Sequence, residues 1–457
     1  MNKYFFKIIM KNKYTKLLVL VFIFICVIVT LQLREDVHEY SYDDYVFKYK
    51  SEVIDNTRIL KRDKYNARHA DTTLFNTTPE GDVALLQYDI WKVKISKELL
   101  AMLEDSQEIT DDFLEAEKKY EILKELCEIQ SCISVPNGDE PIEKACEDEM
   151  KKYADYLSLE ELSFSFKDLA YCGQGTLDRE LSEAHDNLIL QAKIVFDKID
   201  NRAVNYGESS PFVFLAMLFG DLNLTPILIN ISLLLYAMGV VICWKENGEY
   251  RCKINVNQSD FKMFARYNGC LLISSMLLIL GAIGFFFIIW GFLGDFSGFT
   301  SRIMCDADNF NSIVNFAHED DFQRIGLSKV FYDYVDYFWS FTIHNYQLVD
   351  FRLFLVAAVC LGFLKIFFYI LLGAGVGFVF SSRVKAVICG IVLSTMVVIG
   401  NFILKPSGVN PFTIGSCWNI TLGGYGITWL NAVLLLAACI VILYVFFNIV
   451  IKLKDTE

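Results

Sequence analysis

Two long apolar runs separated by a short polar loop constrain the fold of this chain more than any other feature. The runs cover residues 222–243 and 268–293, and each provides roughly the 20 apolar residues that a helix needs to cross a bilayer. The loop between them, residues 244–266, contains five basic side chains: Lys245, Arg251, Lys253, Lys262 and Arg266. Short loops rich in Lys and Arg remain on the cytoplasmic side of a membrane. This loop therefore predicts the direction of every other span.

Four further apolar runs predict an α-helical polytopic membrane protein with six transmembrane helices. They cover residues 17–33, 351–380, 384–404 and 428–451. The run at 17–33 is long for a signal peptide and no small-x-small cleavage site follows it, so we expect it to be retained. Basic residues accompany each predicted inner segment, including the turn after residue 380 and the tail 452–457. Both termini are therefore expected in the cytoplasm, and the plasma membrane is the expected location.

Residues 1–16 precede the first span and are predicted to form a cytoplasmic amphipathic helix. Lys3, Lys7 and Lys11 are spaced by four residues, which places them on one face of a helix. Phe5, Phe6 and Ile9 fall largely elsewhere on that helix, so it is suited to lie at the inner membrane interface. The alternative interpretation is a basic segment without fixed structure.

The segment 34–210, between the first and second spans, is predicted to be an extracytoplasmic acidic domain. It contains 40 of the 55 Asp and Glu residues but 22 of the 42 Lys and Arg residues. Apolar residues recur at helical spacing over 92–131 and 178–204, which predicts a mostly helical domain. An acidic surface of this kind disfavours binding to nucleic acid.

The remaining segments connect the spans. Residues 211–243 are expected to hold an interfacial helix followed by the second span, and the third span is placed at 267–294. The segments 295–350 and 405–427 are expected to be outer loops. Aromatic residues suggest one helix within the first of these loops: Phe331, Tyr334, Phe338 and Trp339.

Six cysteines are expected on the outer side, and their even number permits three disulfides in an oxidising environment. Cys305 and Cys417 would join the two outer loops, and the other four could pair in three ways. These four are Cys127, Cys132, Cys146 and Cys172. The alternative is that all six remain free thiols.

Signatures of catalysis or of direct ATP binding are missing from the sequence. There is no phosphate-binding P-loop motif, and the five histidines do not have metal-ligand spacing. We therefore expect no enzyme, no metal site and no cofactor bound by this chain. Gly373 and Gly377 lie four residues apart within an apolar run, which predicts close helix packing. Lys365 lies in the same run, either paired within the bundle or in contact with a substrate or ion.

The membrane part resembles the membrane subunits of type-two ABC exporters, which export drugs, bacteriocins and polysaccharides. In that family a Glu-x-Gly-like turn and a short amphipathic coupling helix follow the second span. Glu246 and Gly248 match the turn, and Asp260 lies where the coupling segment continues. The residues 381–383 and 410–412, together with Trp418, also fit the pattern. The resemblance covers the membrane part and the N-terminus, whereas the acidic domain matches nothing in the family.

The resemblance implies a permease subunit of an ATP-driven exporter of a peptide, drug or lipid-like substrate. A separate cytoplasmic ABC ATPase would bind ATP and magnesium and would press on the 244–266 loop. Glu246, Gly248 and Asp260 would then couple the ATPase to the permease, and Lys3, Lys7 and Lys11 would help to seat it. Homodimers or heterodimers of such permeases are expected within the lipid bilayer. The alternative function is a membrane-anchored receptor or adhesion protein whose outer helical domain binds a ligand.

Overall fold

The computed structural model divides the chain into two compact units, which are described separately. The bundle unit comprises Met1–Val37, Val204–Gly326 and Val349–Glu457, and the helical unit comprises His38–Ala203 and Leu327–Leu348. Within these units the structure describes residues 2–36, 41–69, 79–131, 140–172, 179–200, 211–216, 218–219, 224–247, 260–293, 296, 300–313, 346–380, 382–402, 410–412, 417–423 and 427–456.

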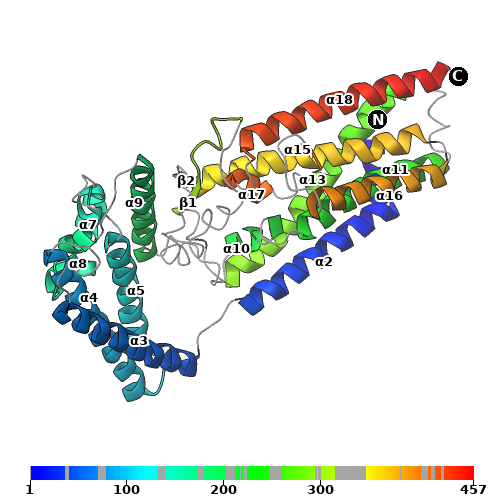
Figure 1. Ribbon diagram of the computed structural model, residues 1–457. Helices are drawn as coiled ribbons and strands as arrows, with labels where there is room; N and C mark the ends of the chain where they lie inside the picture. The colour runs from blue at the N-terminus through cyan, green and yellow to red at the C-terminus, as the bar shows by residue number, and fades with distance from the viewer. Residues whose placement is uncertain are drawn as a thin grey trace. The chain divides into compact units, whose positions relative to one another are not determined.

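Among the described residues of the bundle unit, six helices are long and apolar enough to cross a membrane, and they coincide with the six predicted spans. They run alongside one another in Figure 1, and they are α2 (Lys13–Asp36), α11 (Leu224–Glu246), α13 (Asp260–Leu293), α15 (Phe351–Val379), α16 (Arg383–Phe402) and α18 (Trp429–Thr456). Helix α13 begins before the predicted start at 267. Its polar first turns continue the backbone hydrogen bonding of the helix, which an apolar pattern does not reveal.

Helix α11 is enclosed by its neighbours and packs closely against α15. Its most apolar stretch is 72% buried, whereas the corresponding stretch of α15 is 39% buried. A Cβ atom added at Gly373 would lie 2.2 Å from the backbone oxygen of Leu234, and one at Gly377 would lie 2.9 Å from Cβ of Val241. The two glycines therefore lie where the backbones of α15 and α11 approach each other, as small residues do between membrane helices.

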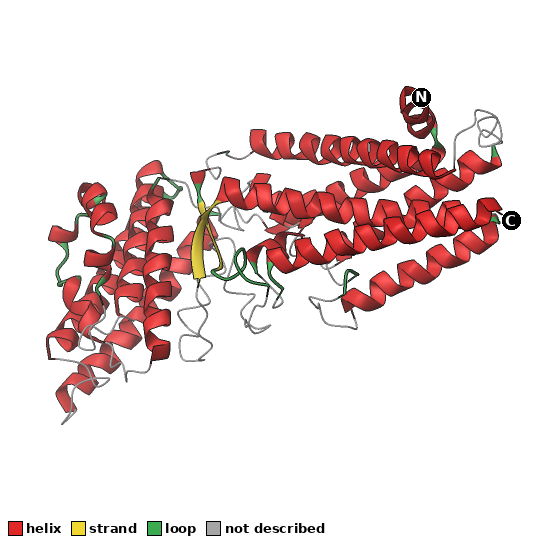
Figure 2. Ribbon diagram, turned by 90° about the horizontal axis from the view of Figure 1, so that it is seen from above, coloured by secondary structure: helices red, strands yellow, loops and turns green. Residues whose placement is uncertain are grey.

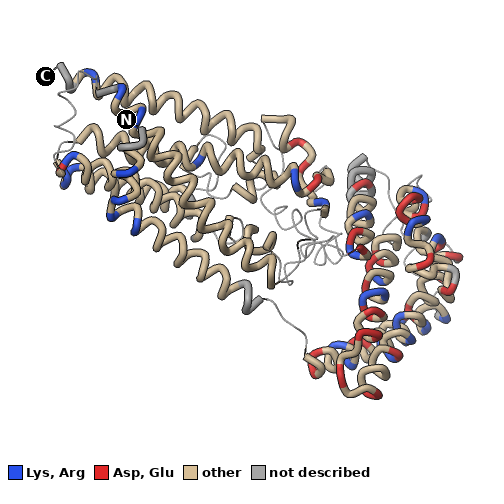
Figure 3. The backbone as a smooth tube through the Cα atoms, turned by 180° about the vertical axis from the view of Figure 1, so that it is seen from behind, with Lys and Arg blue, Asp and Glu red and all other residues tan. Residues whose placement is uncertain are grey.

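Both chain termini lie at one end of the bundle unit (Figure 1). The Lys and Arg residues of this unit gather mainly at the same end, as Figure 3 shows in blue. Exposed examples are Lys7, Lys11, Arg383 and Lys385. These described basic residues, which were expected on the cytoplasmic side, therefore lie at one end of the bundle.

Short elements lie toward the other end of the spans. Helix α10 (Pro211–Ala216) precedes α11, and helix α17 (Cys417–Leu422) precedes α18. Strands β1 (Arg302–Asp306) and β2 (Tyr346–Asp350) form a two-stranded sheet, drawn in yellow in Figure 2. The sequence did not predict this sheet, because each strand is short and its partner is distant in the chain. The helix expected around 331–339 lies outside the described residues.

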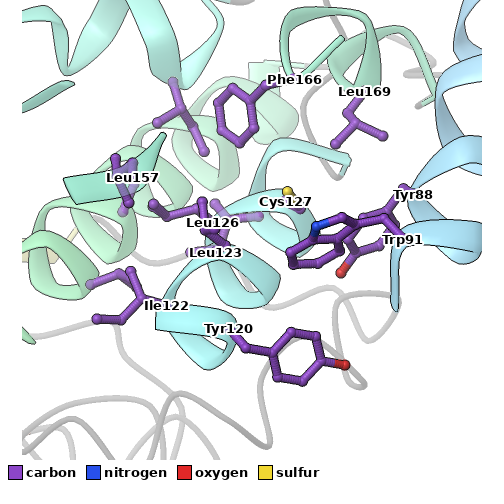
Figure 4. Close-up of a cluster of buried hydrophobic side chains, with 14 of the residues drawn as sticks. Tyr88, Trp91, Tyr120, Ile122, Leu123, Leu126, Cys127, Leu157, Phe166 and Leu169 are labelled. Atoms are coloured by element: carbon purple, nitrogen blue, oxygen red, sulfur yellow. The ribbon is translucent and has the colours of Figure 1, made fainter. Parts of the chain in front are cut away.

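The helical unit is built mostly from helices, as predicted. The longer ones are α3 (Tyr42–His69), α4 (Pro79–Ser106), α5 (Asp111–Ser131) and α9 (Arg179–Ile199). Shorter ones are α6 (Ile142–Ala145), α7 (Glu147–Lys152), α8 (Ala154–Leu157), η3 (Leu159–Glu161) and η4 (Lys167–Cys172). Figure 4 shows its core, where Trp91 of α4 lies near Tyr88 and faces Leu126 and Cys127 of α5.

Ion pairs connect α3 to α5 beside this core. The ammonium of Lys48 lies 2.8 Å from a carboxylate oxygen of Glu117 and 2.9 Å from one of Glu121. The ammonium of Lys124 lies 2.8 Å from Glu52. Burial alone would lower the pKa of Lys48, but Glu121 and Glu117 raise it above its usual value. Several of the carboxylates that make the segment acidic therefore form ion pairs within the unit.

One carboxyl group buried between α3 and α4 is in surroundings that disfavour its ionised form. Asp89 is 2% exposed, and the ammonium of Lys92 lies 2.9 Å from its Oδ1 atom. Burial raises the pKa of Asp89, Lys92 opposes this change, and the neighbouring Asp63 carboxyl raises the pKa further. Desolvation and a nearby like charge both disfavour an ionised carboxylate.

Candidate functional site at one end of the bundle

Helix α1 (Asn2–Lys11) and the ends of three spans lie together at the end of the bundle that carries both termini. We call this region the joint; it consists of helix α1, the end of α11, the start of α13 and the end of α15. The loop 248–259, which contains Gly248, lies outside the described residues. The joint comprises the described residues on both sides of that loop.

A cluster of buried aromatic rings holds α1 in the joint. The ring of Phe5 lies 5.9 Å from that of Trp244 in α11 and 5.5 Å from that of Tyr267 in α13. Trp244 and Tyr267 stack at 4.8 Å, and Phe378 of α15 lies 6.0 Å from Trp244. Phe5, Trp244 and Tyr267 are fully buried. Four helices therefore share one small core, and α1 cannot move away without exposing Phe5.

Helix α1 has the two faces that the sequence predicted. Phe5 and Ile9 are buried and Phe6 is half-buried, whereas Lys7 and Lys11 are exposed; the side chain of Lys3 lies outside the described residues. Asn12 forms the corner between α1 and α2, where its side-chain oxygen accepts a hydrogen bond of 3.0 Å from the backbone N–H of Tyr14. The exposed lysines therefore lie on a helix whose C-terminal end is held in place by the turn at Asn12.

Lys245 ties the end of α11 to the end of α15. Its ammonium donates hydrogen bonds to the carbonyl oxygens of Gly377, at 2.8 Å, and Phe378, at 2.6 Å. The last carbonyls of a helix have no partner within the helix, and the helix dipole favours a positive charge there. Sequence analysis counted Lys245 only as one of the basic loop residues, because the carbonyls it caps lie more than a hundred residues away in the chain.

The predicted coupling residues occupy different positions around the joint. Glu246 ends α11 and lies 3.8 Å from the guanidinium of Arg383, where α16 begins. Both side chains are about half exposed, at 47% and 55%, so this pair contributes little to stability. Asp260 is the first residue of α13. Glu246 is therefore accessible, and Lys245 beside it is the residue that fixes the helix end.

Of the predicted disulfides, the link between Cys305 and Cys417 is not formed in the structure. The thiols of Cys127, Cys305 and Cys417 are free, and Cys146 is buried in the helical-unit core. Cys132 and the side chain of Cys172 lie outside the described residues. Cys417 lines the contact between α17 and α15, since its sulfur is 4.0 Å from where a Cβ atom at Gly362 would stand. Cys417 therefore packs on α15 and is not joined to Cys305.

Comparisons with known proteins give no further assignment. No protein-family profile, curated protein or solved structure matches the chain. Among the described residues, no group of His, Cys, Asp and Glu side chains is placed to hold a metal ion. The function proposed below is therefore based on the spans and on the geometry of the joint.

Proposed function

We propose that this chain is the membrane-spanning permease subunit of an ATP-driven ABC exporter. A separate cytoplasmic ATPase binds ATP and magnesium, contacts the joint and drives the export, or the extraction from the membrane, of a peptide, drug or lipid-like substrate. The permease works as a dimer, with itself or with a related subunit. In this arrangement the joint is cytoplasmic and residues 34–210 are extracytoplasmic.

The observation that carries this proposal is the shared core of the joint. Phe5 packs against both Trp244, which precedes the 248–259 loop, and Tyr267, which follows it. A protein that pushes on the loop would therefore move α1, α11 and α13 together. Lys245 extends the connection to α15. A membrane anchor has no need for such a linkage between four helices at one end.

The proposal is tested by purifying the tagged protein from its own host in mild detergent. We expect an ATPase with a P-loop to copurify in stoichiometric amounts, as identified by mass spectrometry. Recovery of no ATPase, by copurification or by trapping with ATP and vanadate, would overturn the proposal. The second candidate is then a receptor or adhesion protein, which the helical unit favours because it has a hydrophobic core of its own.

A charge reversal at Glu246 tests the role of the joint more directly. We expect Glu246→Arg to abolish transport-coupled ATPase activity because the exposed carboxylate contacts the ATPase. The matched control is the double variant Glu246→Arg with Arg383→Glu, which restores the ion pair in the opposite sense. If the double variant recovers full activity, the role of the Glu246 carboxylate is to pair with Arg383 and not to contact the ATPase. If Glu246→Arg is silent, the coupling role of this residue is wrong.

A further inference from the structure

A cavity of about 310 Å³ lies within the bundle unit, between α11, α13 and α15. On α11 it is lined by residues between Pro226 and Leu233, near the start of the helix. The joint lies at the other end of α11, so the cavity is a separate feature. Leu215, from α10, and Trp418, from α17, also line it.

The walls of the cavity are almost entirely apolar. Aliphatic and aromatic side chains from α13 and α15 make up most of the surface, among them Met276, Ile283, Phe287, Leu355, Phe363 and Ile366. Small-molecule sites have volumes of about 300–1,000 Å³, and this cavity is near the lower limit. It can hold one acyl chain or a compact apolar molecule but not a peptide.

Among the described lining residues, three polar side chains interrupt the apolar surface, and each comes from a different helix. Asn230 of α11 is fully buried, and neither atom of its amide has a hydrogen-bond partner among the described residues. The indole N–H of Trp418 is likewise buried without a partner there. Lys365 of α15 is 6% exposed. None of the described lining residues is Asp or Glu, and Lys365 is the charged side chain among them.

We propose that the cavity binds a single-chain amphiphile with an anionic head, of which a long-chain carboxylate is the representative. The buried polar atoms of Asn230 and Trp418 have no partner among the described residues, and burying such groups without partners is costly. A carboxylate would accept hydrogen bonds from both side chains and lie beside the ammonium of Lys365, while its chain lies along the apolar wall. Hydrogen bonds between an ammonium and a carboxylate are among the strongest in proteins. This inference does not depend on the proposed ATPase partner.

The test uses the full chain in phosphatidylcholine vesicles, labelled with a palmitate that bears a diazirine. We expect adducts within 276–287 or 355–366. The concentration of laurate that halves labelling should be lower than that of dodecanol, which lacks the charge, by a factor of ~10 or more. Lys365→Met should remove this preference for laurate. The matched control, Lys385→Met, alters an exposed lysine away from the cavity and should keep it.

A second pair of variants tests the cavity without changing any charge. A Cβ atom added at Gly284, which lines the cavity, or at Gly281, which does not, would meet nothing within 4 Å. Gly284→Leu should therefore fold and fill the cavity, which would abolish labelling there. Gly281→Leu adds the same side chain to the same helix and should leave labelling unchanged. This pair remains informative if Lys365→Met does not fold.

Several results would overturn the inference. Adducts spread over exposed residues of α16 and α18, such as Ile388 and Phe446, would show that the probe labels the lipid-facing surface non-specifically and does not bind in the cavity. Equal competition by laurate and dodecanol, or an unchanged laurate preference in Lys365→Met, would remove the role of the charge. Competition by phosphatidylglycerol as strong as that by laurate would assign the cavity to a membrane lipid instead of a single-chain ligand.

Discussion

Lys245 shows how one side chain can fix the meeting of two helices. Its ammonium caps the C-terminal carbonyls of α15 at 2.8 and 2.6 Å while its backbone belongs to α11. We expect Lys245→Met to destabilise the joint by about 1.5–3 kcal/mol, the usual contribution of hydrogen bonds to a charged group. Faster hydrogen exchange of the amides near Gly377 would reveal the loss.

The matched control for Lys245→Met is Lys385→Met, because Lys385 is exposed beside the same end of the bundle. We expect that variant to exchange like the wild type. Lys245→Arg keeps the charge and should retain most of the protection near Gly377. Equal exchange in wild type and Lys245→Met would show that the two hydrogen bonds do not hold the end of α15.

Asp89 gives the helical unit a defined dependence on pH. Burial, partly opposed by Lys92, raises the pKa of this carboxyl in the folded state. The folded chain therefore keeps the proton at a pH where the unfolded chain, with a pKa of about 3.9 for Asp, has lost it. The resulting stability is present at low pH and is lost as the pH rises through the raised pKa.

In the wild type, the free energy of unfolding should fall between mildly acidic and neutral pH. We expect this fall to be smaller in Asp89→Asn, because asparagine resembles the protonated acid and does not titrate. Hydrogen exchange of the α4 amides, corrected for the intrinsic pH dependence of exchange, measures this change. Asp105→Asn, at an exposed position of the same helix, is the control and should keep the wild-type slope. If stability depends on pH in Asp89→Asn as it does in the wild type, the pH dependence does not come from Asp89.

At the scale of elements, the contact between α11 and α15 depends on the absence of side chains. A methyl group at Gly373 would overlap the carbonyl oxygen of Leu234, so Gly373→Ala must push the two backbones apart. We expect a loss of about 1–3 kcal/mol, as for overpacked cores, measured from the thermal unfolding midpoint in detergent. Gly281→Ala, which meets open space on α13, should be neutral or stabilising. An unchanged midpoint for Gly373→Ala would show that α15 can shift freely.

The sequence predicted the spans well because a bilayer demands long apolar runs, and such runs are local in the chain. Lys7, Lys11, Phe5 and Ile9 were placed on the correct faces of α1 for the same reason. The role of Lys245, the pairing of β1 with β2 and the cavity near Asn230 were not predicted. Each depends on residues brought together from distant parts of the chain, which no periodicity encodes.

At the scale of the whole bundle unit, α11 connects the cavity to the joint. Asn230 and Trp244 are 14 residues apart on this helix, which corresponds to ~21 Å at 1.5 Å per residue. The α13 and α15 helices also contribute to both regions. A change in the cavity that tilts α11 would therefore alter the packing around Phe5. This geometry gives a ligand in the cavity a physical route to the proposed ATPase contact.

The direction of the bundle in the membrane is a prediction of its own. Exposed basic residues gather at the end that carries both termini, including Lys7, Lys11, Arg383 and Lys385, and such residues remain in the cytoplasm. Protease added to intact cells or protoplasts should therefore cleave within 34–210, while epitope tags on both termini stay protected until the membrane is permeabilised. Cleavage of the tags with protection of 34–210 would reverse the topology, and the joint would then be unable to contact a cytoplasmic ATPase.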